Sequence, residues 1–285
     1  MVRNTLFTLL LLFVPLVSCS KSNDVLLKEI QSDDRTVRLN AAMKLNVQTK
    51  DPATIASMVA MLDTADDRTK LIVTQILGTT ADSSLVEPLS RMVYHPNAAI
   101  RDCAVRSIGA LGAKSAAPHL IKALGDSSSD VRYSAVRMLG NIKSPEAVPS
   151  LFPLFRDQVD SVRAVTVQTL YLYRVNRWAP INASDFLVPM SDRSDLVRYA
   201  TAQALGIPYP DSTLAGDLLV QTLSDPNKFV RLKAIISLRQ LRYERSVPYL
   251  KSMYDFATVE EELEITDTIK AITGETYPPD EPAMK

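Results

Sequence analysis

Apolar residues recur along this chain at the spacing of an α-helix. In residues 131–142, Val131, Ala135 and Leu139 lie at i, i+4 and i+8, with Met138 and Ile142 at i+7 and i+11, so all five share one helical face. The strict alternation of a half-buried strand is absent. Residues 116–124 form another apolar segment, and residues 125–130 contain turn formers. This stretch therefore predicts two helices joined by a turn.

The two-helix pattern repeats along the chain. A marker residue lies near the start of each second helix, and it is basic in all but the last unit. Successive marker residues are 32, 31, 31, 31, 35, 33 and 33 positions apart. They are Arg38, Lys70, Arg101, Arg132, Arg163, Arg198, Arg231 and, more loosely, Glu264. Random placement of basic residues would not give so narrow a spread. No single unit can bury its apolar face alone, so we expect the units to stack into an α-solenoid.

Four of the turns carry an aspartate six residues before the arginine. The pairs are Asp126 and Arg132, Asp157 and Arg163, Asp192 and Arg198, and Asp225 and Arg231. Together with the repeat length, this pattern resembles the HEAT-repeat family, specifically the short HEAT-like repeats of the bilin-lyase type, over roughly residues 24–273. The resemblance implies an all-α fold, a right-handed α-solenoid (alpha-alpha superhelix) of about eight two-helix HEAT-like repeats. The other units depart from it, with Ser32, Thr64, His95 and Thr258 in place of the aspartate.

The aspartates and arginines also have a physical role. A cation in the first turn of a helix opposes the helix dipole, so each arginine requires an anion nearby. We expect the turn carboxylates to form a ladder of charge-assisted hydrogen bonds that joins successive turns and is incomplete where the aspartate is missing. This role is structural, so these residues are not predicted to form a binding site.

The N-terminus has the features of a bacterial export signal. Arg3 precedes an apolar run of 12 residues, 6–17 (LFTLLLLFVPLV), whereas a spanning helix needs roughly 20. The sequence Leu16-Val17-Ser18-Cys19 then resembles a lipobox, which implies cleavage after residue 18 and acylation of Cys19. We expect a signal peptide over 1–18, a short tether over 19–23, and a lipid-anchored protein at the bacterial cell envelope. Ser20 favours the outer membrane in a Gram-negative cell. The alternative is an ordinary secretory signal with an incidental cysteine.

Composition and motifs argue against catalysis. Lys plus Arg and Asp plus Glu both total 32, which gives no basic footprint for nucleic acid. His95 and His119 lack metal-ligand spacing, and they are followed by Pro and Leu rather than by the glutamates of the iron-binding HEAT-like enzyme deoxyhypusine hydroxylase. Phosphate-binding glycine loops are absent, and Cys103 is expected to pack inside a helix. We therefore predict a protein that is not an enzyme and has no cofactor and no metal.

Two segments interrupt the repeats. Residues 174–182 (RVNRWAPIN) account for the step of 35 residues and contain the single tryptophan, Trp178. A bend or protruding loop is expected there, and Trp178 either fills the gap in the stack or serves as an exposed interaction anchor. Residues 274–285 (GETYPPDEPAMK) are predicted to be a disordered, Pro-rich tail.

Positions one and five after the repeat residue should face solvent on the inner curve. Exposed Tyr and Arg are favoured at protein interfaces. The predicted partner-binding residues on this row, which also contains Ala164, are Arg106, Tyr133, Arg137, Gln168, Tyr199 and Gln203. The expected function is a non-catalytic protein-binding scaffold or adaptor that takes a protein or extended peptide on its concave face. The alternative, from the family resemblance, is a bilin-lyase-like cofactor chaperone or lyase.

Overall fold

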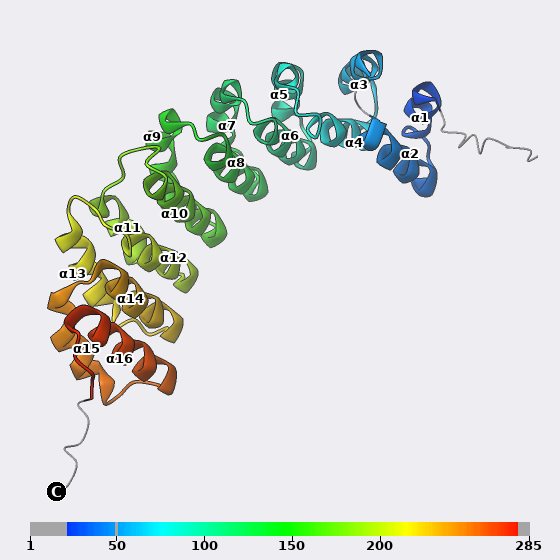
Figure 1. Cartoon of the computed structure of the whole chain (residues 1–285). Coiled ribbons are helices and arrows are strands. Elements are labelled where there is room, and N and C mark those ends of the chain that lie inside the picture. The colour runs from blue at the N-terminus through cyan, green and yellow to red at the C-terminus, as the bar shows by residue number, and fades with distance from the viewer. Residues whose placement is uncertain (1–21, 49–50, 279–285) are drawn as a thin grey trace, which may run out of the picture.

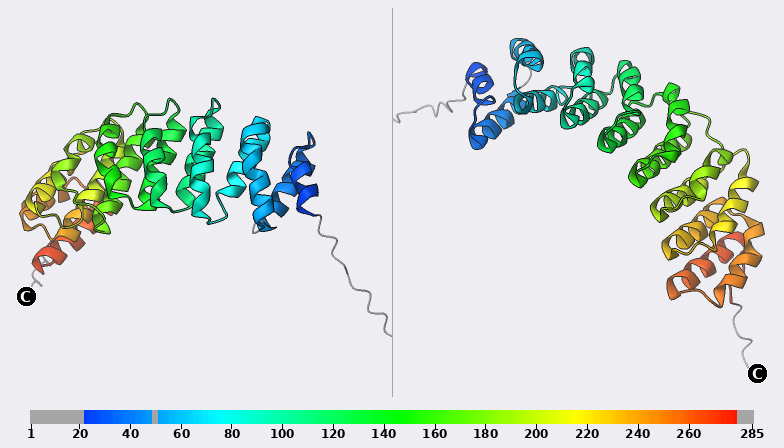
Figure 2. Two further views of the ribbon diagram at one scale, coloured as in Figure 1. Left: turned by 90° about the horizontal axis from the view of Figure 1, so that it is seen from above. Right: turned by 180° about the vertical axis from the view of Figure 1, so that it is seen from behind.

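The chain folds into an arc of stacked helix pairs. The computed structural model describes residues 22–48 and 51–278. Within these ranges it contains sixteen α-helices and seven short 3-10 helices, with no strand. Figures 1 and 2 show the α-helices stacked pair by pair along the arc. The predicted all-α solenoid of two-helix units is confirmed.

The helices form two rows. The inner row lines the concave side of the arc in Figure 1 and consists of α2 (Arg35–Gln48), α4 (Asp67–Leu77), α6 (Ala98–Ala110), α8 (Ser129–Ile142), α10 (Asp160–Val175), α12 (Asp195–Leu205), α14 (Lys228–Leu241) and α16 (Val259–Thr273). The outer row consists of α1 (Asn23–Glu29), α3 (Pro52–Thr64), α5 (Val86–Ser90), α7 (Ala117–Ala123), α9 (Val148–Leu151), α11 (Leu187–Met190), α13 (Ser212–Thr222) and α15 (Val247–Tyr254). The 3-10 helices flank the outer row at η1 (Ser83–Leu85), η2 (Arg91–Tyr94), η3 (Lys114–Ala116), η4 (Pro145–Ala147), η5 (Phe152–Arg156), η6 (Ala183–Phe186) and η7 (Glu244–Ser246).

The start of α8 shows how the turns place the inner helices. The sequence predicts a start at residue 131, but the helix begins at Ser129. The Asp126 carboxylate accepts a hydrogen bond from the Ser128 N–H at 2.8 Å, and the Ser128 carbonyl accepts the first helical bond from the Arg132 N–H at 3.2 Å. The turn carboxylate therefore fixes where the chain enters the helix.

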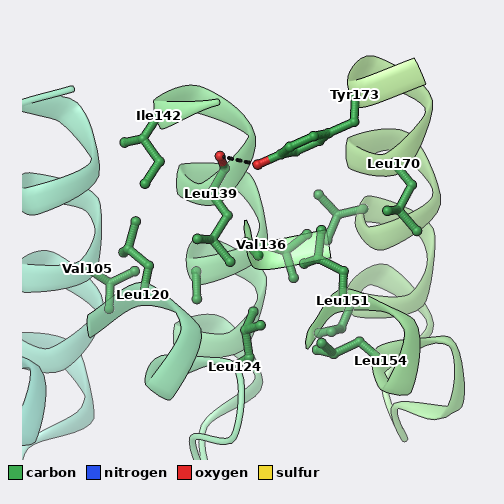
Figure 3. Close-up of a cluster of buried hydrophobic side chains, with 14 of the residues drawn as sticks. Val105, Leu120, Leu124, Val136, Leu139, Ile142, Leu151, Leu154, Leu170 and Tyr173 are labelled. Carbon is green, nitrogen blue, oxygen red and sulfur yellow. Dashed lines mark hydrogen bonds between the residues drawn. The ribbon is translucent and has the colours of Figure 1, made fainter. Parts of the chain in front are cut away.

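One apolar layer runs between the two rows. Figure 3 shows its central part, where side chains from α6, α7, α8, α9 and α10 interdigitate. Leu120, Leu139 and Leu170 are fully buried, and burying each such side chain contributes roughly 1.5–3 kcal/mol. The Tyr173 side chain reaches from α10 to α8, where its hydroxyl donates a hydrogen bond to the Leu139 carbonyl at 2.8 Å. Because the layer continues from unit to unit, each unit is stabilised by its neighbours.

Small residues let the inner helices approach closely. A Cβ atom added to Gly78 would lie 2.5 Å from the Ser107 Cβ, and one added to Gly109 would lie 2.3 Å from the Met138 Cβ. At the first contact, the Ser107 hydroxyl donates to the Thr74 carbonyl at 2.9 Å. At these two contacts, α6 and α8 thus pack closely against the backbone of the preceding inner helix.

The insertion after α10 folds back onto the stack and does not protrude. The Trp178 N–H donates to the Tyr173 carbonyl at 2.8 Å, and the two rings pack edge to face with centroids 5.7 Å apart. Ala179 and Ile181, which follow in the sequence, are buried. Trp178 is half-buried, so it fills part of the gap in the stack and keeps part of its ring exposed.

The ends of the chain are described only in part. The predicted signal peptide, residues 1–18, and Cys19 lie outside the described residues. At the other end, the rings of Tyr277 and Tyr254 pack edge to face with centroids 5.3 Å apart. The first part of the tail that was predicted to be disordered therefore contacts the last residue of α15. Residues 279–285 lie outside the described residues. Among the helices of residues 22–48 and 51–278, none combines the length and apolar character needed to cross a bilayer.

Candidate functional site

A ladder of partly buried ion pairs runs along the turns. In each pair the arginine reaches the carboxylate of the next unit: Arg101–Asp126, Arg132–Asp157, Arg163–Asp192, Arg198–Asp225 and Arg231–Glu261, at 2.6–2.7 Å. The same guanidinium also donates to the backbone carbonyl six residues before it, as Arg132 does to the Asp126 carbonyl at 2.8 Å. Each arginine therefore closes its own turn and joins it to the following turn, which confirms the predicted ladder.

The end of the ladder corrects the sequence analysis. Thr258 replaces the turn aspartate, so the ladder was expected to be incomplete here. Glu261 is instead 1% exposed. It accepts from the Arg231 guanidinium at 2.7 Å and from the Thr258 N–H at 2.9 Å. A longer side chain in the first turn of α16 therefore completes the ladder in place of the missing aspartate.

The ladder carboxylates are held in their charged form. Burial alone raises the pKa of the Asp157 and Asp192 carboxyls, but hydrogen bonds from arginine and backbone N–H groups outweigh it, so each pKa lies below the ordinary value of 3.8. The Glu261 pKa is lowered in the same way against the same burial. These groups remain ionised and paired at neutral pH, which favours the structural role over ligand binding.

The inner row exposes much of the predicted partner surface. Arg106, Arg137, Gln168 and Gln203 are exposed, whereas Tyr133 and Tyr199 are half-buried. Ala164, expected on the same row, is only 3% exposed. The exposed members of the predicted surface are therefore its Arg and Gln side chains, and its two tyrosines are partly covered.

One groove brings two of the predicted residues together. It lies between α8 and α10, has a volume of about 380 Å³, and is lined by Arg137, Asn141, Lys143, Gln168, Leu172 and Trp178 among others. We call it the Trp178 groove. Sequence reasoning placed Arg137 and Gln168 on this surface but missed Lys143 and Leu172. The fold-back of the insertion, which brings Trp178 beside them, has no signal in the repeat pattern.

A model of HEAT repeats matches residues 85–171 and 184–262, which is more than half of the chain. The chain belongs to the HEAT-repeat family. A comparison with curated proteins finds no match.

Two solved structures share the HEAT solenoid fold. The Escherichia coli protein YibA is 18% identical, with a TM-score of 0.64 over 88% of this chain and 92% of that chain. An engineered protein is 17% identical, with a TM-score of 0.51 over 87% and 78%. The complex of CpcE and CpcF of phycocyanin lyase from Nostoc sp. PCC7120 is 18% identical, with a TM-score of 0.46 over 89% and 95%. At identities of 17–18%, the first two structures show the fold alone.

The other predicted partner residues lie elsewhere on the HEAT solenoid. Arg106 lines a smaller groove of about 160 Å³ with Gln75, and its guanidinium is paired with the Asp102 carboxylate at 2.9 Å. Tyr199 lines a third groove, of about 180 Å³, with Phe229. The structure therefore distributes the predicted surface over several units of the inner row.

Of the residues considered for catalysis or metal binding, the cysteine is buried and each histidine lies beside a carboxylate. Cys103 is 4% exposed, and burial raises the pKa of its thiol, so the neutral thiol is favoured. His95 Nε2 lies 3.6 Å from an Asp67 carboxylate oxygen, and His119 Nε2 lies 3.9 Å from one of Glu87. The described residues contain no group of three His, Cys, Asp or Glu side chains that could hold a metal ion.

Proposed function

We propose that this HEAT solenoid is a non-catalytic protein-binding scaffold or adaptor, held at the bacterial cell envelope by acyl chains on Cys19. The observation that carries the proposal is the exposed row of Arg137, Gln168 and Gln203 on three successive inner helices. Its side chains offer hydrogen-bond donors and acceptors over several units, an arrangement suited to a protein or an extended peptide.

The buried nucleophile supports the non-catalytic part of the proposal. A cysteine acts as a nucleophile through its thiolate, which needs a lowered pKa and access to substrate. Cys103 has a raised pKa and is buried, and its thiol lies 3.6 Å from the Leu71 carbonyl. We assign it to packing between α4 and α6.

The position of the first helix supports the anchoring part. Helix α1 begins at Asn23, four residues after Cys19 in the sequence. Four extended residues span at most about 14 Å. Acyl chains on Cys19 would therefore keep the N-terminal tip of the arc at the membrane surface, while the later units extend away from it along the arc of Figure 1.

Site-specific photocrosslinking tests the scaffold proposal. A photoreactive amino acid placed at Gln168 or Gln203 in bacterial membranes should capture the same protein. The matched position on the outer row is Glu87, whose side chain is 84% exposed, and it should not capture that protein. Equal capture from Glu87, or no capture from either inner position, would remove the proposal.

Metabolic labelling tests the anchor separately. A palmitate analogue should label the wild-type chain and leave Cys19→Ala unlabelled. Labelling that persists in Cys19→Ala, or a wild-type chain that stays unlabelled, would contradict anchoring through Cys19.

A further inference from the structure

We propose that the Trp178 groove recognises an acidic segment of the partner, in which carboxylate side chains alternate with apolar ones. This inference rests on the proposed function, because it names the chemistry of the partner that the inner row would bind. It follows from the charges of the groove, the way its cations are held and its apolar wall.

The cations of the groove lack carboxylate partners. Arg106 and Arg239, on other inner helices, pair with Asp102 at 2.9 Å and with Glu264 at 3.0 Å. Arg137 and Lys143 form no ion pair within residues 22–48 and 51–278, and no Asp or Glu lines the groove. Two unpaired positive charges beside one groove favour an anionic ligand.

Both cations are held at the groove by aromatic rings. The Arg137 guanidinium lies 5.9 Å from the centroid of the Tyr133 ring, and the Lys143 ammonium lies 5.1 Å from that of Trp178. These cation–π contacts restrict two flexible side chains before a ligand arrives. Binding an anion there costs less conformational entropy than binding to freely moving side chains.

The helix dipole explains only one of the two charges. Lys143 directly follows α8, where a cation stabilises the exposed carbonyl groups of the helix end. Arg137 lies near the middle of the same helix, more than one turn from either end, and the dipole effect is confined to the terminal turns. Arg137 is therefore free to pair with an anion that enters the groove.

The remaining wall suits an extended peptide. Leu172 is 44% exposed and lines the groove together with Trp178, which provides an apolar contact. Asn141 Nδ2 donates to the Gly109 carbonyl at 2.9 Å, so its Oδ1 is directed to accept a hydrogen bond, such as that of a peptide N–H. A volume of about 380 Å³ accommodates a few side chains of such a segment.

The fluorescence of Trp178 tests the proposal directly, because it is the only tryptophan of the chain. The probes are the peptide acetyl-Glu-Leu-Glu-Leu-amide and its uncharged counterpart acetyl-Gln-Leu-Gln-Leu-amide. We expect the acidic peptide to change the emission with an affinity at least tenfold higher than that of the amide peptide, and this preference should weaken as salt is added.

Matched variants localise the effect. Arg137→Gln combined with Lys143→Gln should reduce the affinity for the acidic peptide at least tenfold and leave the amide peptide unaffected. Arg239→Gln, on the inner helix α14 but already paired with Glu264, should leave both affinities unchanged. Circular dichroism confirms that each variant keeps its helices.

Two outcomes overturn the inference. Equal affinity for the two peptides would exclude recognition of charge, and unchanged Trp178 emission with the acidic peptide would exclude the groove as its site. In either case, continued crosslinking from Gln203 would leave the scaffold proposal standing. Loss of crosslinking together with tight acidic-peptide binding would instead reject the scaffold proposal and keep the groove.

Discussion

Arg163 donates two hydrogen bonds to the carboxylate of Asp192, at 2.6 and 2.8 Å, across the longest step of the repeat. The pair is separated by 29 residues in sequence, against 25 for Arg101–Asp126. The ladder thus keeps its geometry through the insertion, whose extra residues are taken up by the fold-back around Trp178.

Breaking this pair should be costly. The side chains of Arg163 and Asp192 are 4% and 9% exposed, so Asp192→Ala leaves a buried cation without its partner. We expect a loss of about 3–5 kcal/mol in the free energy of unfolding, measured by urea denaturation. Asp63→Ala removes the exposed pair between Arg91 and Asp63, whose side chains are 48% and 56% exposed, respectively. This variant should lose less than about 1 kcal/mol in the free energy of unfolding. Similar losses in both variants would contradict a special role of the ladder.

The ladder should also make the free energy of unfolding depend on pH in the acidic range. The pKa values of Asp126, Asp157, Asp192, Asp225 and Glu261 are lowered in the folded chain. A lowered pKa gives stability that is complete above the unfolded values, 3.8 for Asp and 4.5 for Glu, and is lost as the pH falls through the folded values. The urea midpoint should therefore stay constant from pH 7 to about 5 and fall steeply below about 4. Asp192→Asn should show a shallower fall, and an identical curve would exclude the pair as a cause.

Gly109→Ala should destabilise the chain, although Ala is the better helix former by about 1 kcal/mol. The new Cβ would lie 2.3 Å from the Met138 Cβ, so α6 and α8 must separate. We expect a net loss of about 1–3 kcal/mol by urea denaturation. Gly125→Ala is the control, since its Cβ would meet nothing closer than the Lys122 carbonyl at 3.7 Å. A gain in stability for Gly109→Ala would show that the helices can move apart freely.

Arg242→Gly should stabilise the chain. Arg242 ends α14 in the left-handed region, with φ 50° and ψ 46°, where a side chain costs roughly 1 kcal/mol. Glycine avoids that cost, so the midpoint of thermal unfolding should rise. Gly112 occupies the same region with φ 70°, and Gly112→Ala should lower the midpoint by a comparable amount. Changes of equal sign in the two variants would refute this explanation.

Sequence periodicity was sufficient to predict the repeats and the residues that form their core. The positions of Val131, Ala135 and Leu139 on one helical face correctly predict that all three are buried, because a helix has one geometry. The ladder was predictable in kind, since a cation in a first turn needs an anion. Its register was not, because only the stacked structure shows that Arg132 pairs with Asp157 of the next unit.

The candidate site was less predictable. Arg137 and Gln168 follow from helical spacing. Lys143 reaches the Trp178 groove from a left-handed position, φ 56°, after the end of α8, and Trp178 reaches it through a loop that folds back. Both placements depend on tertiary packing and not on local pattern. The completion of the ladder by Glu261 was missed for the same reason, because its partner Arg231 lies 30 residues away in the sequence.

The ladder begins at Arg101, so the first two units lack it. In the described part of the chain, Arg38 donates only to the backbone carbonyls of Ser32 and Asp33, and an exposed contact between Arg68 and Asp33 at 3.9 Å joins units one and two. Mechanical tension entering through an N-terminal tether would peel these units away first. The five later contacts between units, each closed by an arginine–carboxylate pair, would stay intact. The first two units would therefore extend under load before the stiffer remainder of the solenoid.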